Sequence, residues 1–317
     1  MAKKLLLLAY FFPPTVVSGS VRPASFTAHL GEHGFRTHVL SSAPECVQPP
    51  AALDETLADL IPADVEVTRL RYADRRVLAL RLRDLLRGQH GAVRESKPAV
   101  ADSVSHSKSG TSSLASVSKL LTERFFMFPD QQKDWARAAF RYGRRLAGPS
   151  KPDVVLATGS PWSCLVAGAR IAKAHGVPFV ADFRDPWTVN TKLSGAPSLQ
   201  SQAHRLERFV VGSATRVIAN TEPLREWFRE TYPLDERKFV TITNGVNSQL
   251  LALLESQERA VSSTDGVDLR YFGSVSKQRM PRTLLTALGE LLDKGMAGPG
   301  RLTVTFTGPW APLDPGL

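Results

Sequence analysis

The chain has 317 residues, 43% of them hydrophobic, and a formal net charge of +10. This length supplies enough core for one large domain or two smaller ones. Every apolar run is shorter than the roughly 20 residues that cross a bilayer, and residues 5–12 are too short and too lightly flanked for a signal peptide. Cys46 and Cys164 lack metal-ligand spacing. We therefore expect a soluble, cytoplasmic protein with two inert thiols.

The positive charge indicates an acidic partner, which could be nucleic acid, an anionic membrane surface or a phosphorylated substrate. Between Arg69 and Arg87, seven arginines accompany only two aspartates. Helical spacing there places leucines on one face and arginines on the other. Such a helix could lie on the anionic inner face of the plasma membrane. Packing of the leucines on the protein core is the more ordinary interpretation. Without a recognised binding motif, we expect no nucleic acid as a partner.

Strand and helix patterns alternate along the chain, which predicts an α/β fold with a doubly wound parallel sheet. A serine-dominated stretch at about 103–118 predicts a mobile insertion, and a polar linker at about 255–266 predicts a domain boundary. We thus expect one domain over 1–260 and a second over 266–317. The expected strands of the first are Leu5–Ala9, Thr37–Leu40, Val65–Arg69, Val154–Ala157, Phe179–Asp182, Arg216–Ala219 and Phe239–Ile242.

The first expected strand runs into two prolines, a glycine and an arginine. Gly19 would let the backbone approach a ligand closely, and Arg22 can bind a phosphate through two donors. A helix expected from about Pro23 to His33 would present its N-terminus to the same anion. The stretch therefore predicts an anion-binding loop, with an ordinary turn and a solvated Arg22 as the equal alternative.

Polar residues follow further expected strands, and ligands of open α/β sheets bind at the carboxyl ends of the strands. In the turn TGSPWS, Ser160 could help to bind a sugar or phosphate, or it could cap a helix with Pro161 at its first position. After the next strand come Asp182, Arg184 and Asp185. These three can orient sugar hydroxyls or assist proton transfer, and a pair between Arg184 and either aspartate is the alternative.

Two more turns complete the set of strand ends. Asn220-Thr221 opens an expected helix, and Asn244-Gly245 closes the last strand before the predicted boundary. Asn-Gly by itself is an ordinary tight turn. Nothing in the chain spells the dinucleotide fingerprint, so a nicotinamide-dependent enzyme is not expected.

Taken in chain order, these segments resemble GT-B glycosyltransferases of family 4, which are retaining enzymes that use nucleotide sugars. The resemblance covers nearly the whole chain. It is carried by YFFPP with Gly19 and Arg22, Pro129-Asp130 with Trp135, KPDVVLATGSPWS, VPFVADFRDPW, VIANTEPL, ITNGVN and LRYFGSVSKQRMPRTLLTAL.

The resemblance implies two Rossmann-like domains, with the acceptor bound mainly by the N-terminal one and the nucleotide sugar mainly by the C-terminal one. Family members continue through an acidic motif and a closing helix that have no counterpart before Leu317. We therefore expect the C-terminal domain to be incomplete, through natural or artificial truncation or because a separate chain completes it.

The resemblance also implies the site residues. Arg184, Asp185 and Asp182 are the expected catalytic residues, at a place where many family members have a histidine. No metal and no cofactor are implied, because the nucleotide sugar is the donor substrate. Contacts to substrate are expected from Gly19, Arg22, Ser160, Trp162, Trp187 and Asn244, and contacts to the donor diphosphate from Gly273, Lys277 and Arg279.

The sequence thus predicts a hexosyltransferase that acts on an acceptor hydroxyl with retention of configuration. We expect a lipid-linked or soluble glycan as acceptor, in surface polysaccharide or lipopolysaccharide biosynthesis, and peripheral membrane attachment through the arginine-rich stretch. The alternative is a non-catalytic or partial acceptor-binding module that lacks a complete donor site.

Overall fold

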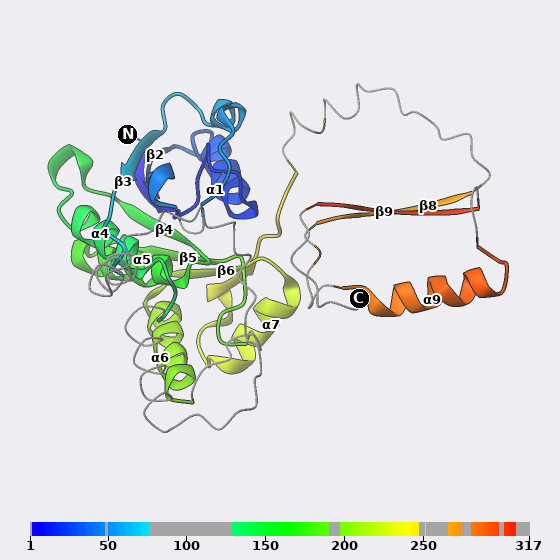
Figure 1. Ribbon diagram of the computed structural model, residues 1–317. Coiled ribbons are helices and arrows are strands. Elements are labelled where there is room, and N and C mark those ends of the chain that lie inside the picture. Colours follow the sequence, from blue (N-terminus) through cyan, green and yellow to red (C-terminus); the bar gives the residue numbers. More distant parts are fainter. Residues whose placement is uncertain are drawn as a thin grey trace, which may run out of the picture. The chain divides into compact units, whose positions relative to one another are not determined.

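The computed structural model describes residues 2–47, 50–75, 128–189, 197–246, 251, 266–273, 275, 280–297 and 301–308. The chain divides into two compact units, and their described residues are those up to 246 and those from 251 onward (Figure 1). The predicted serine-rich insertion and the arginine-rich stretch from residue 76 lie outside the described residues. Residues 255–265 of the predicted linker also lie outside the described residues. The expected domain limits remain a prediction.

The first unit is built on a parallel sheet of seven strands in the order β3-β2-β1-β4-β5-β6-β7. This order confirms the predicted doubly wound α/β fold, and it reverses direction between β1 and β4, where such sheets bind their ligands. The strands are β1 (Lys3–Leu8), β2 (Phe35–Ser42), β3 (Glu66–Leu70), β4 (Val154–Gly159), β5 (Phe179–Phe183), β6 (Arg216–Ala219) and β7 (Phe239–Thr241).

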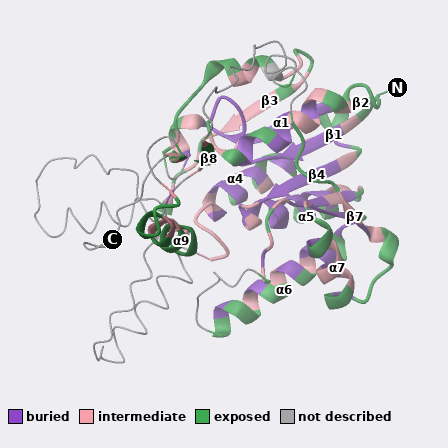
Figure 2. Cartoon of the chain, turned by 90° about the vertical axis from the view of Figure 1, so that its right-hand side faces the viewer, coloured by how far each residue is buried: buried purple, intermediate pink, exposed green. Residues whose placement is uncertain are grey.

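Helices cover both faces of this sheet, which explains why β1 is an unbroken apolar run. Leu6 and Leu8 pack in one core cluster, whereas Leu5 and Leu7 pack in the other, because alternate residues of a strand point to opposite faces. Figure 2 shows the buried strands between more exposed helices. The helices are α1 (Ser18–Leu30), α4 (Lys133–Gly143), α5 (Trp162–His175), α6 (Pro197–Ser213) and α7 (Glu222–Thr231), and short 3-10 turns span Pro44–Cys46, Glu55–Leu60, Gly148–Ser150 and Glu236–Lys238.

Two helix starts differ from the sequence prediction. α1 begins at Ser18, so Pro23 lies inside this helix and not at its start. α5 begins at Trp162, with Pro161 as its N-cap and without a capping side chain at that position, so the predicted cap by Ser160 is wrong. α7 begins after Asn220-Thr221, as expected, and Thr221 caps it, because its Oγ1 accepts a hydrogen bond of 3.4 Å from the amide of Leu224.

The second unit contains a parallel pair of strands, β8 (Val267–Phe272) and β9 (Leu302–Thr307), joined through α9 (Arg282–Asp293). These three elements lie within residues 266–317, the range expected for a second domain. They form the β-α-β arrangement from which doubly wound sheets are assembled. The incompleteness of this domain stays a prediction.

Candidate functional site

The carboxyl ends of β1, β4 and β5 and the start of α1 bring most of the predicted site residues together. Gly19 and Arg22 come from α1, Ser160 follows β4, and Asp182 and Arg184 come from the end of β5. Hydrogen bonds link Arg22 to Asp182 and Arg184 to the carbonyls of Gly19 and Ser160. The parallel sheet explains this convergence, because all of these strands end at one edge.

Arg22 and Asp182 form a buried ion pair in which both carboxylate oxygens take part. Nη2 of Arg22 lies 2.8 Å from Oδ1 of Asp182, and Nε lies 3.0 Å from Oδ2. The two side chains are 5% and 0% exposed. Thr158 at the end of β4 donates a further hydrogen bond of 2.7 Å to Oδ2. Asp182 is therefore a positioned, water-excluded carboxylate.

The other donors of Arg22 bind the segment that follows β7. Nη2 donates to the carbonyl of Ile242 (2.7 Å), and Nη1 donates to the carbonyl of Thr243 (3.0 Å) and to Oδ1 of Asn244 (3.1 Å). A solvated Arg22 is thus contradicted, since all five N–H donors of the guanidinium have partners inside the protein. The internal ion pair of Asp182 is formed with Arg22 and not with Arg184. Binding of a phosphate by Arg22 remains a prediction, and it would require an exchange of these partners.

Arg184 fastens the start of α1 to the turn after β4. Because Pro23 has no N–H, the carbonyl of Gly19 four residues earlier lacks a helical donor. Nη1 of Arg184 donates to that carbonyl at 2.5 Å, and Nη2 donates to the carbonyl of Ser160. A Cβ at position 19 would lie 2.5 Å from Nη1, so glycine permits this close approach. Burial lowers the pKa of Arg184, while the neighbouring Asp185 and Asp182 oppose that shift.

Asp185 differs from the other two predicted catalytic residues in its contact with solvent. Its side chain is 53% exposed, and its Oδ2 lies 3.7 Å from Nε of Arg184. The Arg184 side chain is only 11% exposed. A carboxylate beside a guanidinium at the edge of the sheet can orient a substrate hydroxyl or accept the proton of that hydroxyl. Asp185 is therefore the acidic group of this cluster that is open to a substrate.

Asp130 caps the start of α5, a role that was one of the two alternatives for Ser160. Its Oδ2 accepts a hydrogen bond of 2.7 Å from the amide of Ser163, and its Oδ1 accepts one of 2.6 Å from the Ser163 hydroxyl. Burial raises the pKa of Asp130, while these hydrogen bonds act in the opposite direction. The Pro129-Asp130 pair belongs to the motifs of the sequence, but it lies some thirty residues before the helix, so no local pattern indicates the capping role of the carboxylate.

Trp162 and Trp187 stack on each other, with ring centroids 5.8 Å apart and planes 7° from parallel. Trp187 is fully buried, whereas Trp162 is partly exposed. The indole N–H groups of both rings have no acceptor among the described residues. Trp162 is therefore the member of the pair that reaches the surface, and substrate contact by either ring stays a prediction.

A second buried carboxylate, Glu207 of α6, was missed by the sequence analysis. It accepts hydrogen bonds from the hydroxyl of Thr188 and, at 2.9 Å, from that of Tyr232. Burial raises the pKa of Glu207. Because Thr188 directly follows Trp187, this carboxylate fixes the chain just beyond the candidate site. A lone glutamate in an amphipathic helix gives no sequence signal for such a role.

The predicted donor-side residues belong to the second unit. Gly273 directly follows β8 and has a positive φ of 152°, whereas Lys277 and Arg279 lie outside the described residues. Within the described part of the chain, no three His, Cys, Asp or Glu side chains gather in a way that could hold a metal ion. The described helices include none that is long and apolar enough to span a membrane.

Comparison with solved structures finds similar proteins at low sequence identity. HepE from Anabaena, solved with UDP and glucose, has a TM-score of 0.49 and 15% identity over 98% of this chain and 62% of its own. The UDP-GlcNAc 2-epimerase of Neisseria meningitidis, bound to UDP-GlcNAc, has a TM-score of 0.48 and 12% identity over 96% and 66%. Arabidopsis thaliana UGT89C1, complexed with quercetin, has a TM-score of 0.47 and 16% identity over 98% and 70%. This chain thus spans about three fifths of the length of HepE.

A sequence comparison with curated proteins yields no match. A comparison with family models does yield one, to Glycosyltransferase Family 4, over residues 104–250. The matched range includes β4 to β7 and the polar residues at the ends of β4 and β5. This match agrees with the resemblance that the sequence motifs indicated, and over residues 104–250 this chain is similar to Glycosyltransferase Family 4.

Proposed function

We propose that the chain transfers a hexosyl unit from a nucleotide sugar to an acceptor hydroxyl. The observation that carries this proposal is the family match over residues 104–250, which contains Asp182, Arg184 and Asp185 at the carboxyl end of β5. Ligands of doubly wound sheets bind at this edge. The partly exposed carboxylate beside a held guanidinium supplies the groups that hexosyl transfer needs there.

In the proposed reaction, the exposed carboxylate of Asp185 orients the acceptor hydroxyl or accepts its proton. Arg184, which already binds the carbonyls of Gly19 and Ser160, holds the start of α1 against the turn after β4. Asp182 acts as a positioning residue, because Arg22 and Thr158 surround its carboxylate. Acceptor contacts by Trp162, Trp187 and Asn244 belong to the same proposal.

The departing nucleoside diphosphate carries negative charge that the protein must stabilise. We assign this role to the N-terminus of α1 near Gly19 and to Gly273, Lys277 and Arg279 of the second unit. Arg22 would join them only by exchanging its partners inside the protein for the diphosphate. Helix dipoles and basic side chains would do this without a metal ion or a further cofactor. Retention of configuration at the transferred sugar is part of the same proposal.

The proposed acceptor is a lipid-linked or soluble glycan in surface polysaccharide or lipopolysaccharide biosynthesis. The net charge of +10 and the seven arginines between Arg69 and Arg87 support a location at the cytoplasmic face of the plasma membrane. A separate chain that completes the second domain is a further proposed partner.

Calorimetry of the whole chain with UDP-, GDP-, ADP- and dTDP-sugars tests the donor side, and Arg279→Ala should abolish binding. For the transfer step, Asp185→Asn should lower turnover by about 10²–10⁴-fold and leave the donor Kd unchanged. Asp235→Asn, which removes another exposed carboxylate, is the matched control. The anomeric configuration of the product, read by NMR, tests retention. Failure of every donor to bind would refute transfer by this chain alone.

The second candidate function is an acceptor-binding module without turnover. The interior bonding of Arg22 favours it, since each of this residue's donors is occupied by the protein itself. Glycan binding without donor turnover, with both measured on the same preparation, would favour the module. Donor turnover above the Asp185→Asn background would exclude it.

A further inference from the structure

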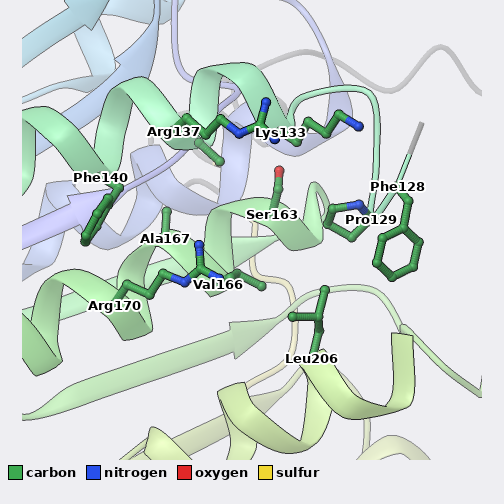
Figure 3. Close-up of a pocket in the computed structure, with 11 residues that line it drawn as sticks. Phe128, Pro129, Lys133, Arg137, Phe140, Ser163, Val166, Ala167, Arg170 and Leu206 are labelled. Atoms are coloured by element: carbon green, nitrogen blue, oxygen red, sulfur yellow. The ribbon is translucent and has the colours of Figure 1, made fainter. Parts of the chain in front are cut away.

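A groove between α4 and α5 has a chemistry that the transfer reaction does not use. It encloses a cavity of about 150 Å³ (Figure 3). Apolar side chains from three helices line it, namely Ala136, Phe140, Val166, Ala167 and Leu206. Such a surface favours hydrocarbon over water.

Basic side chains stand on both walls of this groove. Lys133 and Arg137 come from α4, and Arg170 comes from α5 on the opposite wall (Figure 3). Asp134 partly neutralises Arg137, because its Oδ1 lies 2.6 Å from Nη1. Arg170 is exposed and has neither a hydrogen bond nor an ion pair with any described residue. The walls therefore offer a net positive charge over an apolar floor.

This combination selects an amphiphile with an anionic head. A free phosphate would leave the apolar floor exposed to water. The cavity holds about five times the volume of a water molecule, whereas a helix with its side chains is about 10–12 Å across, so a helical peptide would not fit inside.

We propose that the groove binds an anionic phospholipid of a membrane surface. The phosphate lies between Arg137 and Arg170, and the first part of the acyl chain lies on the apolar floor that Phe140 and Leu206 help to form. This binding is independent of sugar transfer, so it can hold or fail without regard to the proposed function.

Sedimentation of the whole chain with phosphatidylcholine vesicles that contain increasing shares of phosphatidylglycerol tests the proposal. Arg170→Gln and Arg137→Gln should each weaken binding about five-fold, and together about thirty-fold, given the contribution of one basic residue at an anionic surface. Arg216→Gln removes an exposed arginine at the start of β6 and is the matched control. It should bind like the wild type, and thermal unfolding should show that all variants are folded.

Three results would overturn the proposal. An equal loss in Arg216→Gln would mean that only the overall charge attracts the vesicles. Unchanged binding by Arg170→Gln, with a loss when Arg76, Arg83 and Arg87 are replaced by glutamine, would assign the membrane contact to the arginine-rich stretch. Binding of inorganic phosphate or poly-glutamate without vesicles, lost in Arg170→Gln, would assign the groove to a soluble anion or an acidic peptide.

Discussion

Replacement of Arg22 by methionine should strongly destabilise the first unit, because this guanidinium connects three distant parts of the chain. Methionine keeps an unbranched apolar side chain but removes all the donors. Among the described residues, the Asp182 carboxylate would then keep only the bond from Thr158, and the carbonyls of Ile242 and Thr243 would lose a donor. Each of these groups is held by Arg22 in the folded protein.

The size of the effect follows from burial of the pair. The side chains of Arg22 and Asp182 are 5% and 0% exposed, so neither charge can regain water while the protein stays folded. Removal of one partner of such a pair costs about 3–5 kcal/mol of unfolding free energy. Asp182→Asn should fall in the same range, since it leaves the guanidinium buried without a counter-charge. The variant with both changes should cost less than the sum of the two, by about 1–3 kcal/mol.

Urea unfolding followed by tryptophan fluorescence measures these differences in the first unit, which contains four of the five tryptophans, Trp135, Trp162, Trp187 and Trp227. Arg237→Met is the control, because its ion pair with Asp235 is exposed, and it should leave the midpoint unchanged. A loss below about 1 kcal/mol for Arg22→Met, or strict additivity in the double variant, would refute the assigned role of the pair.

Three further changes test other parts of the structure. Gly19→Ala would place a Cβ 2.5 Å from Nη1 of Arg184 and displace this guanidinium from the carbonyls of Gly19 and Ser160, which should cost about 1–3 kcal/mol in thermal unfolding. Gly31→Ala, with nothing within 4 Å, should leave the midpoint unchanged, and equal midpoints for the two variants would contradict this. Burial raises the pKa of Glu207 above its ordinary value of 4.5, so the stabilisation from its protonated form is lost as pH rises from 4.5 through the raised pKa. The unfolding free energy of the wild type should therefore fall relative to that of Glu207→Gln over this pH range. Parallel curves of stability against pH for the two proteins would exclude this effect. Burial also raises the pKa of the Cys164 thiol to about 12, so iodoacetamide should modify Cys164 only at the rate of unfolding. Peptide mapping separates Cys164 from the partly exposed Cys46, and rapid labelling of Cys164 in the folded chain would be the contrary result.

Much of the fold could be predicted from the sequence because it depends on local patterns. The run Leu5–Ala9 is apolar on both faces, as a central strand between two helical layers must be. The alternation of such runs with helical patterns predicts a parallel sheet, and a parallel sheet brings its carboxyl ends to one edge. That rule alone places Gly19, Ser160 and Arg184 at one edge of the sheet.

The partners of the charged groups were decided only by the tertiary structure. Asp182 pairs with Arg22, 160 positions away, and Asp130 caps a helix that begins some thirty residues later. No local spacing encodes such pairs, because they follow from which strands lie side by side and from how far each side chain reaches. The same holds for Pro23, which interrupts the hydrogen bonding of α1 while Arg184 satisfies the carbonyl that the proline leaves free. Periodicity determines the elements and their order, whereas the bonds of buried polar groups depend on the packed sheet, since burial is what compels each of them to find a partner.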